Sequence, residues 1–190
     1  MSVTQSAAGV VLTGATYRAV TSGQAASFDA AVTRLFAGES RAYDRLIAIG
    51  SDFGSIYAVA GAAATLFAVN QRDAATDVAV AGVAAWSVAQ SVKPLMKRSR
   101  PYTDASATRT VAVPHGSSWP SGHTAVATAL ATVLAHRSGA VGRGVLAGYA
   151  TAVGLSRIRV GVHYATDIMA GVGVGLVAGA LAKALRHAQR

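Results

Sequence analysis

Long stretches without charged residues recur along this chain and restrict it to folds that bury apolar helices or place them in lipid. The longest, Phe53 to Gln71, has 19 uncharged residues, close to the roughly 20 that an α-helix needs to cross a bilayer. Several such stretches in 190 residues, with a mean hydropathy of +0.40, favour a membrane bundle over a soluble one. The shorter stretches are Val78 to Val92, Gly122 to Ala135, Gly144 to Ser156 and Ile168 to Ala182.

The composition also favours closely packed helices. Hydrophobic residues make up 52% of the chain, but aromatic residues only 6% and charged residues only 13%. We therefore expect an all-α helical bundle, one domain over residues 1–190, with four to six transmembrane spans. Glycines at every fourth position, Gly171, Gly175 and Gly179, let another helix approach closely.

The N-terminal part is less apolar. Residues 1–27 are small and polar and carry no secretory signal peptide, so a loosely ordered segment is expected there. The pattern of Phe28 to Gly50 predicts one amphipathic helix.

Two polar interruptions, Lys93 to Trp119 and Arg157 to Asp167, separate apolar stretches and predict loops at the same end of the bundle. By the positive-inside rule the cation-rich opposite end lies in the cytoplasm and the two loops lie outside, so we expect an integral protein of a bacterial cell membrane with an extracytoplasmic site. The cations at the opposite end are Arg72, His136, Arg137, Arg143, Lys183, Arg186 and Arg190.

Three clusters in and beside these loops carry groups suited to phosphate chemistry. Lys93 and Arg100 lie seven positions apart, and a point charge and a planar fork suit the oxygens of one phosphate. A basic flank of a membrane helix is the alternative for this cluster. Ser121, Gly122 and His123 begin an apolar stretch, where a serine can cap a helix and a glycine lets an anion reach the backbone amides.

The third cluster combines Arg157, His163 and Asp167. His163 and Asp167 are four positions apart and share one face if the segment is helical. Asp167 can then hold one ring nitrogen of His163 and leave the other for attack, although a surface His–Asp pair is the simpler alternative. Asp167 is also the only carboxylate from Ala105 to the end of the chain. Carboxylates are too few for a two-metal cluster, so we expect neither a metal nor another cofactor.

In this order the clusters resemble the type 2 phosphatidic acid phosphatase superfamily, which includes class A acid phosphatases and vanadium haloperoxidases. The matching patterns are Lys93 to Pro101, Pro120 to His123 and Ser156 to Asp167. The resemblance implies that Lys93, Arg100, Arg157, Ser121 and the Gly122 amide bind phosphate. It further implies that His163 attacks phosphorus, Asp167 orients His163, and His123 protonates the leaving group.

These residues lead us to expect a metal-independent phosphatase that acts on a membrane lipid through a phosphohistidine. The lipid is a phosphomonoester or pyrophosphate of the phosphatidic acid, phosphatidylglycerol phosphate or polyprenyl phosphate type. A vanadate-dependent haloperoxidase and a soluble acid phosphatase remain alternatives. The net charge of +9 also suits a basic membrane- or nucleic-acid-binding protein, but that interpretation leaves the ordered histidines without a purpose, so no nucleic acid is expected as a partner.

Overall fold

The computed structural model describes residues 2–36, 41–103 and 106–188, and its regular secondary structure is helical throughout these ranges. The predicted all-α fold is therefore confirmed. The elements are α1 (Ser2–Thr21), α2 (Ala26–Phe36), α3 (Arg41–Ser51), the 3-10 turn η1 (Asp52–Gly54), α4 (Ile56–Ala68), α5 (Arg72–Met96), the 3-10 turn η2 (Pro101–Thr103), α6 (Gly122–Ala135), α7 (Ala140–Arg159) and α8 (Ala165–Ala188).

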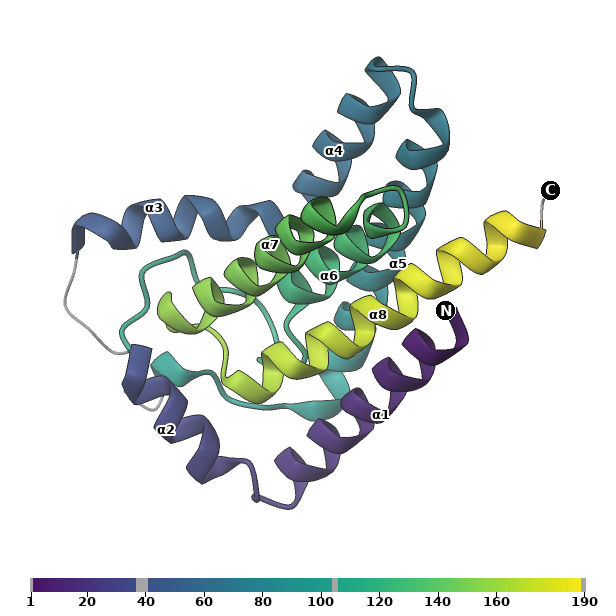
Figure 1. The fold of residues 1–190 in the computed structure, drawn as a ribbon. Coiled ribbons are helices and arrows are strands. Elements are labelled where there is room, and N and C mark those ends of the chain that lie inside the picture. Colours follow the sequence, from purple (N-terminus) through teal and green to yellow (C-terminus); the bar gives the residue numbers. More distant parts are fainter. Residues whose placement is uncertain (1, 37–40, 104–105, 189–190) are drawn as a thin grey trace.

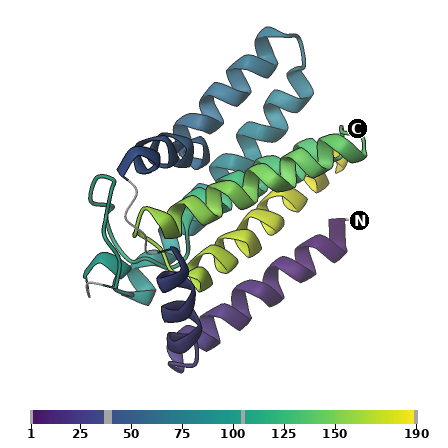
Figure 2. The same ribbon diagram turned by 60° about the vertical axis from the view of Figure 1, so that its left-hand side comes forward.

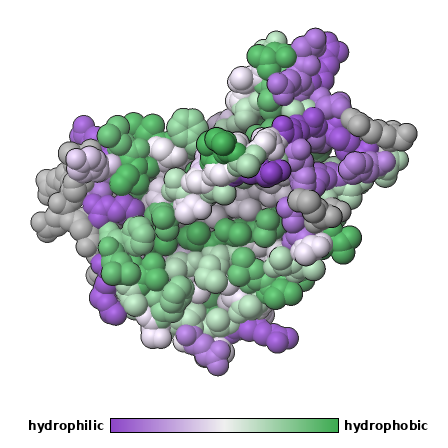
Figure 3. Space-filling model, viewed as in Figure 1, coloured by the Kyte–Doolittle hydropathy of each residue, from purple (hydrophilic) through white to green (hydrophobic). Residues whose placement is uncertain are grey.

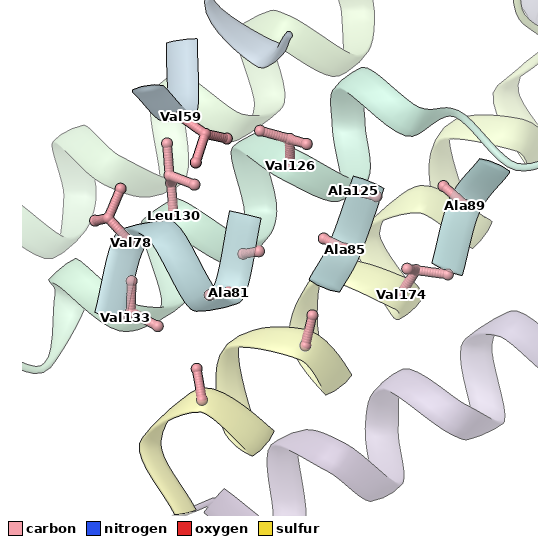
Figure 4. Close-up of a cluster of buried hydrophobic side chains, with 13 residues drawn as sticks. Val59, Val78, Ala81, Ala85, Ala89, Ala125, Val126, Leu130, Val133 and Val174 are labelled. Carbon is pink, nitrogen blue, oxygen red and sulfur yellow. The ribbon is translucent and has the colours of Figure 1, made fainter. Parts of the chain in front are cut away.

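Helix α8 runs through the bundle between α1 on one side and α6 on the other (Figures 1 and 2). Helix α5 packs against both α6 and α8, and α4 packs against α5. The buried cluster at the α4–α5–α6–α8 contact consists of small side chains, mainly alanine and valine, with Leu130 as its largest member (Figure 4). Small side chains bring the helix axes close together, so the helix ends at the site are held by a tightly packed interior.

The glycines of α8 explain the two closest helix contacts. The three glycines at every fourth position face α6, and a methyl group at Gly175 would lie 2.5 Å from the Ala125 carbonyl oxygen. The predicted close approach of another helix is thus confirmed, with α6 as the partner. Gly173 meets α1 instead, where a methyl group at Gly9 would lie 2.5 Å from the Gly173 carbonyl oxygen.

The N-terminal third differs from the sequence-based expectation. Residues 2–21 form helix α1 against α8, so the prediction of a loosely ordered segment was wrong. The hydroxyls of Thr13 and Thr16 are hydrogen-bonded within α1, where each donates to a carbonyl one turn earlier. The single helix predicted for Phe28 to Gly50 is also wrong: α2 and α3 run in different directions (Figure 1), and residues 37–40 between them lie outside the described residues.

Two segments of the described chain are long and apolar enough to cross a membrane, Arg72–Thr103 and Ala165–Ala188. A third is reached if Tyr43–Gly54 and Ile56–Ala68, bent by 66°, count as one broken span. The predicted four to six spans therefore exceed what helix length and hydropathy support. The stretch Phe53 to Gln71 is not one helix, because Ser55 caps a new helix there, accepting a hydrogen bond from the Ala58 amide at 3.3 Å.

Apolar side chains cover the middle of the surface over α1, α7 and α8, and hydrophilic side chains gather toward the two ends (Figure 3). Exposed apolar side chains of these helices include Val10 and Val11 of α1, Val145 and Leu155 of α7, and Leu181 of α8. An apolar face of this kind with polar ends suits a bundle whose middle contacts lipid.

Candidate active site

The predicted site residues meet at the end of the bundle where α5 and α7 end and α6 and α8 begin. Two loops join here: the Thr110 amide donates to the Val160 carbonyl at 3.3 Å, and the Ser121 amide donates to the Asp167 carbonyl at 3.0 Å. A cavity of about 260 Å³ opens between these helix ends. It is lined by six of the eight predicted residues, Lys93, Arg100, Gly122, His123, Arg157 and His163.

Ser121 and Asp167 do not line the cavity, and each supports a residue that does. Five of the eight stand on helix ends and not within the loops. Lys93 belongs to α5, Gly122 and His123 to α6, Arg157 to α7 and Asp167 to α8. The arrangement is therefore fixed by helix packing more than by loop conformation.

His163 and Asp167 form a buried pair, as their spacing predicted. The distance from His163 Nδ1 to Asp167 Oδ2 is 3.4 Å, and the two side chains are 3% and 0% exposed. Asp167 Oδ2 also accepts the Tyr164 amide at 2.9 Å, which fixes the carboxylate at the start of α8. Because Nδ1 faces Asp167, Nε2 is the ring nitrogen left for chemistry. Burial, together with the charges of Arg100, Arg157 and Lys93, holds the pKa of His163 well below its ordinary value, so the ring is neutral.

The second oxygen of Asp167 binds a residue that the sequence analysis did not place in the site. Arg98 Nη1 donates to Asp167 Oδ1 at 2.5 Å, and Arg98 Nη2 pairs with Asp29 of α2 at 2.6 Å. Arg98 stands inside the Lys93–Pro101 cluster, but no spacing rule distinguishes it from its solvated neighbour Lys97. Asp29 carries no sequence signal, because its partner lies 69 positions away.

Ser121 is the N-cap of α6, as predicted. Its Oγ accepts hydrogen bonds from the Thr124 amide at 3.4 Å and the Thr124 hydroxyl at 3.0 Å. His123 in the first turn is half-buried, and its Nε2 lies 3.9 Å from a carboxylate oxygen of the exposed Asp52. Burial, followed by the charge of Arg157, lowers the pKa of His123 to about 3, so this ring is also neutral in the protein alone.

Arg157 and Lys93 bring positive charge into the cavity with few protein partners. Arg157 Nη1 donates to the Ser51 hydroxyl at 2.7 Å, but its buried Nε has no hydrogen-bond partner among the described residues. Buried donors are nearly always satisfied, so an unpaired guanidinium N–H beside a cavity indicates an anion site. The Lys93 side chain makes no hydrogen bond or ion pair with the described parts of the chain and lines the same cavity.

Arg100 has a second role that its spacing did not predict. Its guanidinium donates to four backbone carbonyls, those of His115, Gly116, Ser117 and Val162, at distances from 2.9 to 3.3 Å. A guanidinium has five N–H donors, so Arg100 uses most of them to join the two loops. It contributes charge to the cavity while holding the loop ends in place.

Further cavity-lining residues come from α4 and α5 and were not predicted. Ile56, Tyr57 and Trp86 give the cavity an apolar edge next to the polar site. Tyr57 is 83% exposed, so this edge continues onto the outer surface of the bundle. These residues sit inside uncharged stretches, where apolar side chains carry no signal that separates a cavity edge from a helix core.

Comparison with known proteins places the chain in a family. The model of the PAP2 superfamily matches residues 74–190. The chain belongs to the PAP2 superfamily. The predicted resemblance and the predicted PAP2-type phosphatase class are thereby confirmed, and residues 1–73, including α1 to α4, lie outside the matched region.

Relatives of known sequence and structure agree with this assignment. The chain is 36% identical over 105 residues to decaprenylphosphoryl-5-phosphoribose phosphatase of Mycobacterium tuberculosis, and the match covers 54% of this chain and 57% of that protein. The chain thus spans little more than half the length of this relative. The crystal structure of Aquifex aeolicus LpxE matches with a TM-score of 0.72 and 25% identity, over 80% of this chain and 92% of that one.

A second solved structure shows the same fold over the whole chain. It is that of a transmembrane PAP2 type phosphatidylglycerolphosphate phosphatase from Bacillus subtilis, with a TM-score of 0.74 and 19% identity. The match covers 100% of this chain and 97% of that one. A fold shared with a transmembrane protein agrees with the apolar face and the membrane-length segments found here.

Proposed function

We propose that the protein hydrolyses a phosphate ester of a membrane lipid, without a metal ion, through a phosphohistidine on His163. One observation carries this proposal. His163 is a neutral, buried imidazole whose Nδ1 faces Asp167 and whose ring lines a cavity with three cationic side chains. A neutral nucleophile surrounded by fixed positive charge suits attack on an anionic phosphoryl group.

Phosphoryl transfer depends on positioning and on stabilisation of charge at the equatorial oxygens. Lys93 and Arg157 supply charge and N–H donors to these oxygens, Arg100 adds charge, and the Gly122 amide at the N-terminus of α6 adds a backbone donor. Ser121 holds this helix start in place and stands next to Gly122 in the phosphate-binding set. Fixed cations of this kind fill the role that metal ions have in other phosphatases.

The reaction then has two steps. His163 Nε2 forms a bond to phosphorus while the bond from phosphorus to the lipid oxygen breaks. His123, neutral in the protein alone, takes up the proton of the bound monoanionic phosphate and donates it to the departing oxygen. A water molecule next attacks the phosphohistidine, transfers a proton to His123, and inorganic phosphate leaves. Asp167 keeps the Nδ1 proton of His163 in place and stabilises the positive ring formed in the first step.

The membrane placement belongs to the same proposal. We place the cavity end outside the cytoplasm and the opposite end inside, where Arg137 and Arg186 meet the carboxylate of Asp77. The apolar edge formed by Ile56, Tyr57 and Trp86 lies where acyl or prenyl chains would leave a bound head group. The relatives named above act, by their names, on decaprenylphosphoryl-5-phosphoribose and on phosphatidylglycerolphosphate, which supports a lipid phosphate as substrate.

The test is phosphate release by the purified protein in detergent with excess EDTA. Phosphatidic acid, phosphatidylglycerol phosphate and a polyprenyl phosphate form the substrate panel, with a water-soluble phosphomonoester for comparison. We expect release from at least one lipid, and no release by His163→Ala. Quenching in alkaline detergent with ³²P-labelled substrate should leave a label on the wild type that is stable to alkali and lost in acid, and that His163→Ala lacks.

The matched control is His187→Ala, because His187 is exposed near the end of α8 far from the cavity. It should keep full activity and labelling. Wild-type activity in His163→Ala would contradict the proposed nucleophile, and loss of activity in EDTA that added metal restores would contradict the metal-free mechanism.

A further inference from the structure

The most buried carboxylate outside the predicted site belongs to helix α2. Asp29 is 1% exposed, and it lies in the part of the chain that the family model does not match. An ionised carboxylate is costly to bury unless it is paired and hydrogen-bonded. The hydrogen-bond partners of Asp29 therefore indicate its role.

The side-chain hydrogen bonds of Asp29 to the described residues lead to the start of α8 and to Arg98. Asp29 Oδ1 accepts the Thr166 amide at 2.9 Å, and Oδ2 accepts the Thr166 hydroxyl at 2.7 Å and Arg98 Nη2 at 2.6 Å. Thr166 directly precedes Asp167 in the chain. Asp29 thus binds both the backbone beside Asp167 and the cation that holds Asp167.

Several further contacts hold the Arg98 side chain and backbone in place. Its Nη1 donates to the Thr166 hydroxyl at 2.8 Å as well as to Asp167, and its guanidinium stacks over the Tyr164 ring at 4.4 Å from the centroid. The Arg98 amide donates to the Ser117 hydroxyl at 3.0 Å. A guanidinium held in this way presents one N–H to Asp167 in a single direction, which orients the opposite carboxylate oxygen toward His163.

The charges explain why two acids share this arginine. Arg98 alone beside Asp167 would neutralise the carboxylate and weaken its attraction for the Nδ1 proton of His163. Asp29 offsets the charge of Arg98, so that the three groups together carry one net negative charge next to the histidine. Because the groups are buried, screening by solvent is weak and this difference is felt at His163.

We infer that Asp29 and Arg98 are positioning residues that hold Asp167 in the orientation and charge state needed by His163. This inference rests on the proposed function and adds a contribution of the N-terminal helix α2 to the reaction. Neither residue touches the cavity, so both act through Asp167.

The decisive variant is Asp29→Asn, which keeps the shape and removes the charge. We expect kcat for the lipid phosphate to fall about tenfold, as for other residues that orient a catalytic group, with KM changed less than twofold. Asp29→Glu, which restores the charge, should recover part of this loss. In an Asp167→Asn background the same Asp29→Asn change should have no further effect on kcat, because its route to His163 has been removed.

The matched control is Asp44→Asn, which breaks a second Asp–Arg pair made by the N-terminal part, half-buried with side chains 17% and 16% exposed. Asp44 accepts Arg159 Nε at 3.1 Å and lies on α3, outside the cavity-lining set. It should lower thermal stability but leave kcat unchanged. Equal kcat in Asp29→Asn and the wild type, or a tenfold loss that persists in the Asp167→Asn background, would overturn the inference.

A direct readout separates this inference from the proposed function. In ¹⁵N-histidine-labelled protein, the His163 signal, assigned by its loss in His163→Ala, should show a proton on Nδ1. Asp29→Asn should shift the ring toward a mixture of the two tautomers, and Asp44→Asn should not. If the wild type releases no phosphate, the proposed function fails, while an unchanged tautomer in Asp29→Asn defeats the positioning role in an active or inactive protein alike.

Discussion

Replacing Arg100 by methionine separates two roles that one guanidinium combines. The change removes a positive charge from the cavity and also removes the four hydrogen bonds that join the two loops. Replacing Lys93 by methionine removes a charge from the same cavity without breaking a hydrogen bond to the described residues. The two variants are therefore matched in charge and differ in the contacts that they lose.

The expected loss of stability in Arg100→Met depends on which of the four carbonyls water can reach once the guanidinium is gone. His115 is exposed, so its carbonyl and the neighbouring Gly116 carbonyl can bind water once Arg100 is gone. The bonds to Val162 and Ser117 are buried. Hydrogen bonds to charged donors contribute about 1.5–3 kcal/mol each, so losing the two buried ones costs at least about 3 kcal/mol. For a chain of this size that corresponds to a fall in Tm of roughly 6–12 °C.

The assay is thermal unfolding in detergent followed by tryptophan fluorescence, with phosphate release measured well below the transition. Trp119 is 4% exposed and lies in the loop that Arg100 holds, so its emission reports on this region. We expect both variants to lose activity but only Arg100→Met to lose stability. A Tm for Arg100→Met equal to that of Lys93→Met would refute the structural role of Arg100.

Two further predictions concern pH and packing. Because the pKa values of His163 and His123 are lowered, to about 3 for His123, both rings stay neutral and the proton for the leaving group arrives with a monoanionic phosphate. kcat/KM should therefore rise as pH falls from 8 to 5 through the second phosphate pKa of about 6. A fall in kcat/KM below a pH of about 6.5 would contradict this. Gly175→Ala, with a methyl 2.5 Å from the Ala125 carbonyl oxygen, should lower Tm, whereas Gly148→Ala, which meets nothing within 4 Å, should raise it slightly, and equal shifts would show that α6 and α8 are less close than described.

The helices were predicted best where a local sequence pattern determines where they begin or which neighbour they contact. Ser121 caps α6 because a short polar side chain precedes an apolar run, and the glycines of α8 meet α6 because their spacing puts them on one face. The span count and the state of residues 2–21 depend on tertiary contacts instead. Helix α1 is stabilised by packing Gly9 against Gly173, a contact between residues too far apart for any local pattern to reveal.

In the site, too, local contacts were predicted from the sequence and contacts between distant segments were not. The spacing of His163 and Asp167 predicted their pairing on one face of a helix. The pair forms although His163 lies just before α8, because the chain that enters the helix brings the ring to the carboxylate in its first turn. The role of Arg100 as a clamp between loops required knowledge of where residues 115–117 and 162 lie. The position of Arg100 in its cluster predicted a positive charge at the site but not the hydrogen bonds that join the two loops.

Asp29 shows that the residues of the three clusters do not by themselves make up the whole site. The three clusters supply a nucleophile, an acid and the phosphate-binding cations, but a buried carboxylate such as Asp167 also needs its own partners to stay charged and oriented. Those partners must come from a surface that covers the start of α8, and in this chain helix α2 supplies it. Such a partner needs the right charge and reach but no fixed spacing within a motif, so a different element can supply it in a relative with another N-terminal segment. The covering helix is therefore the part of the fold in which we expect relatives to differ while the His163–Asp167 geometry stays the same.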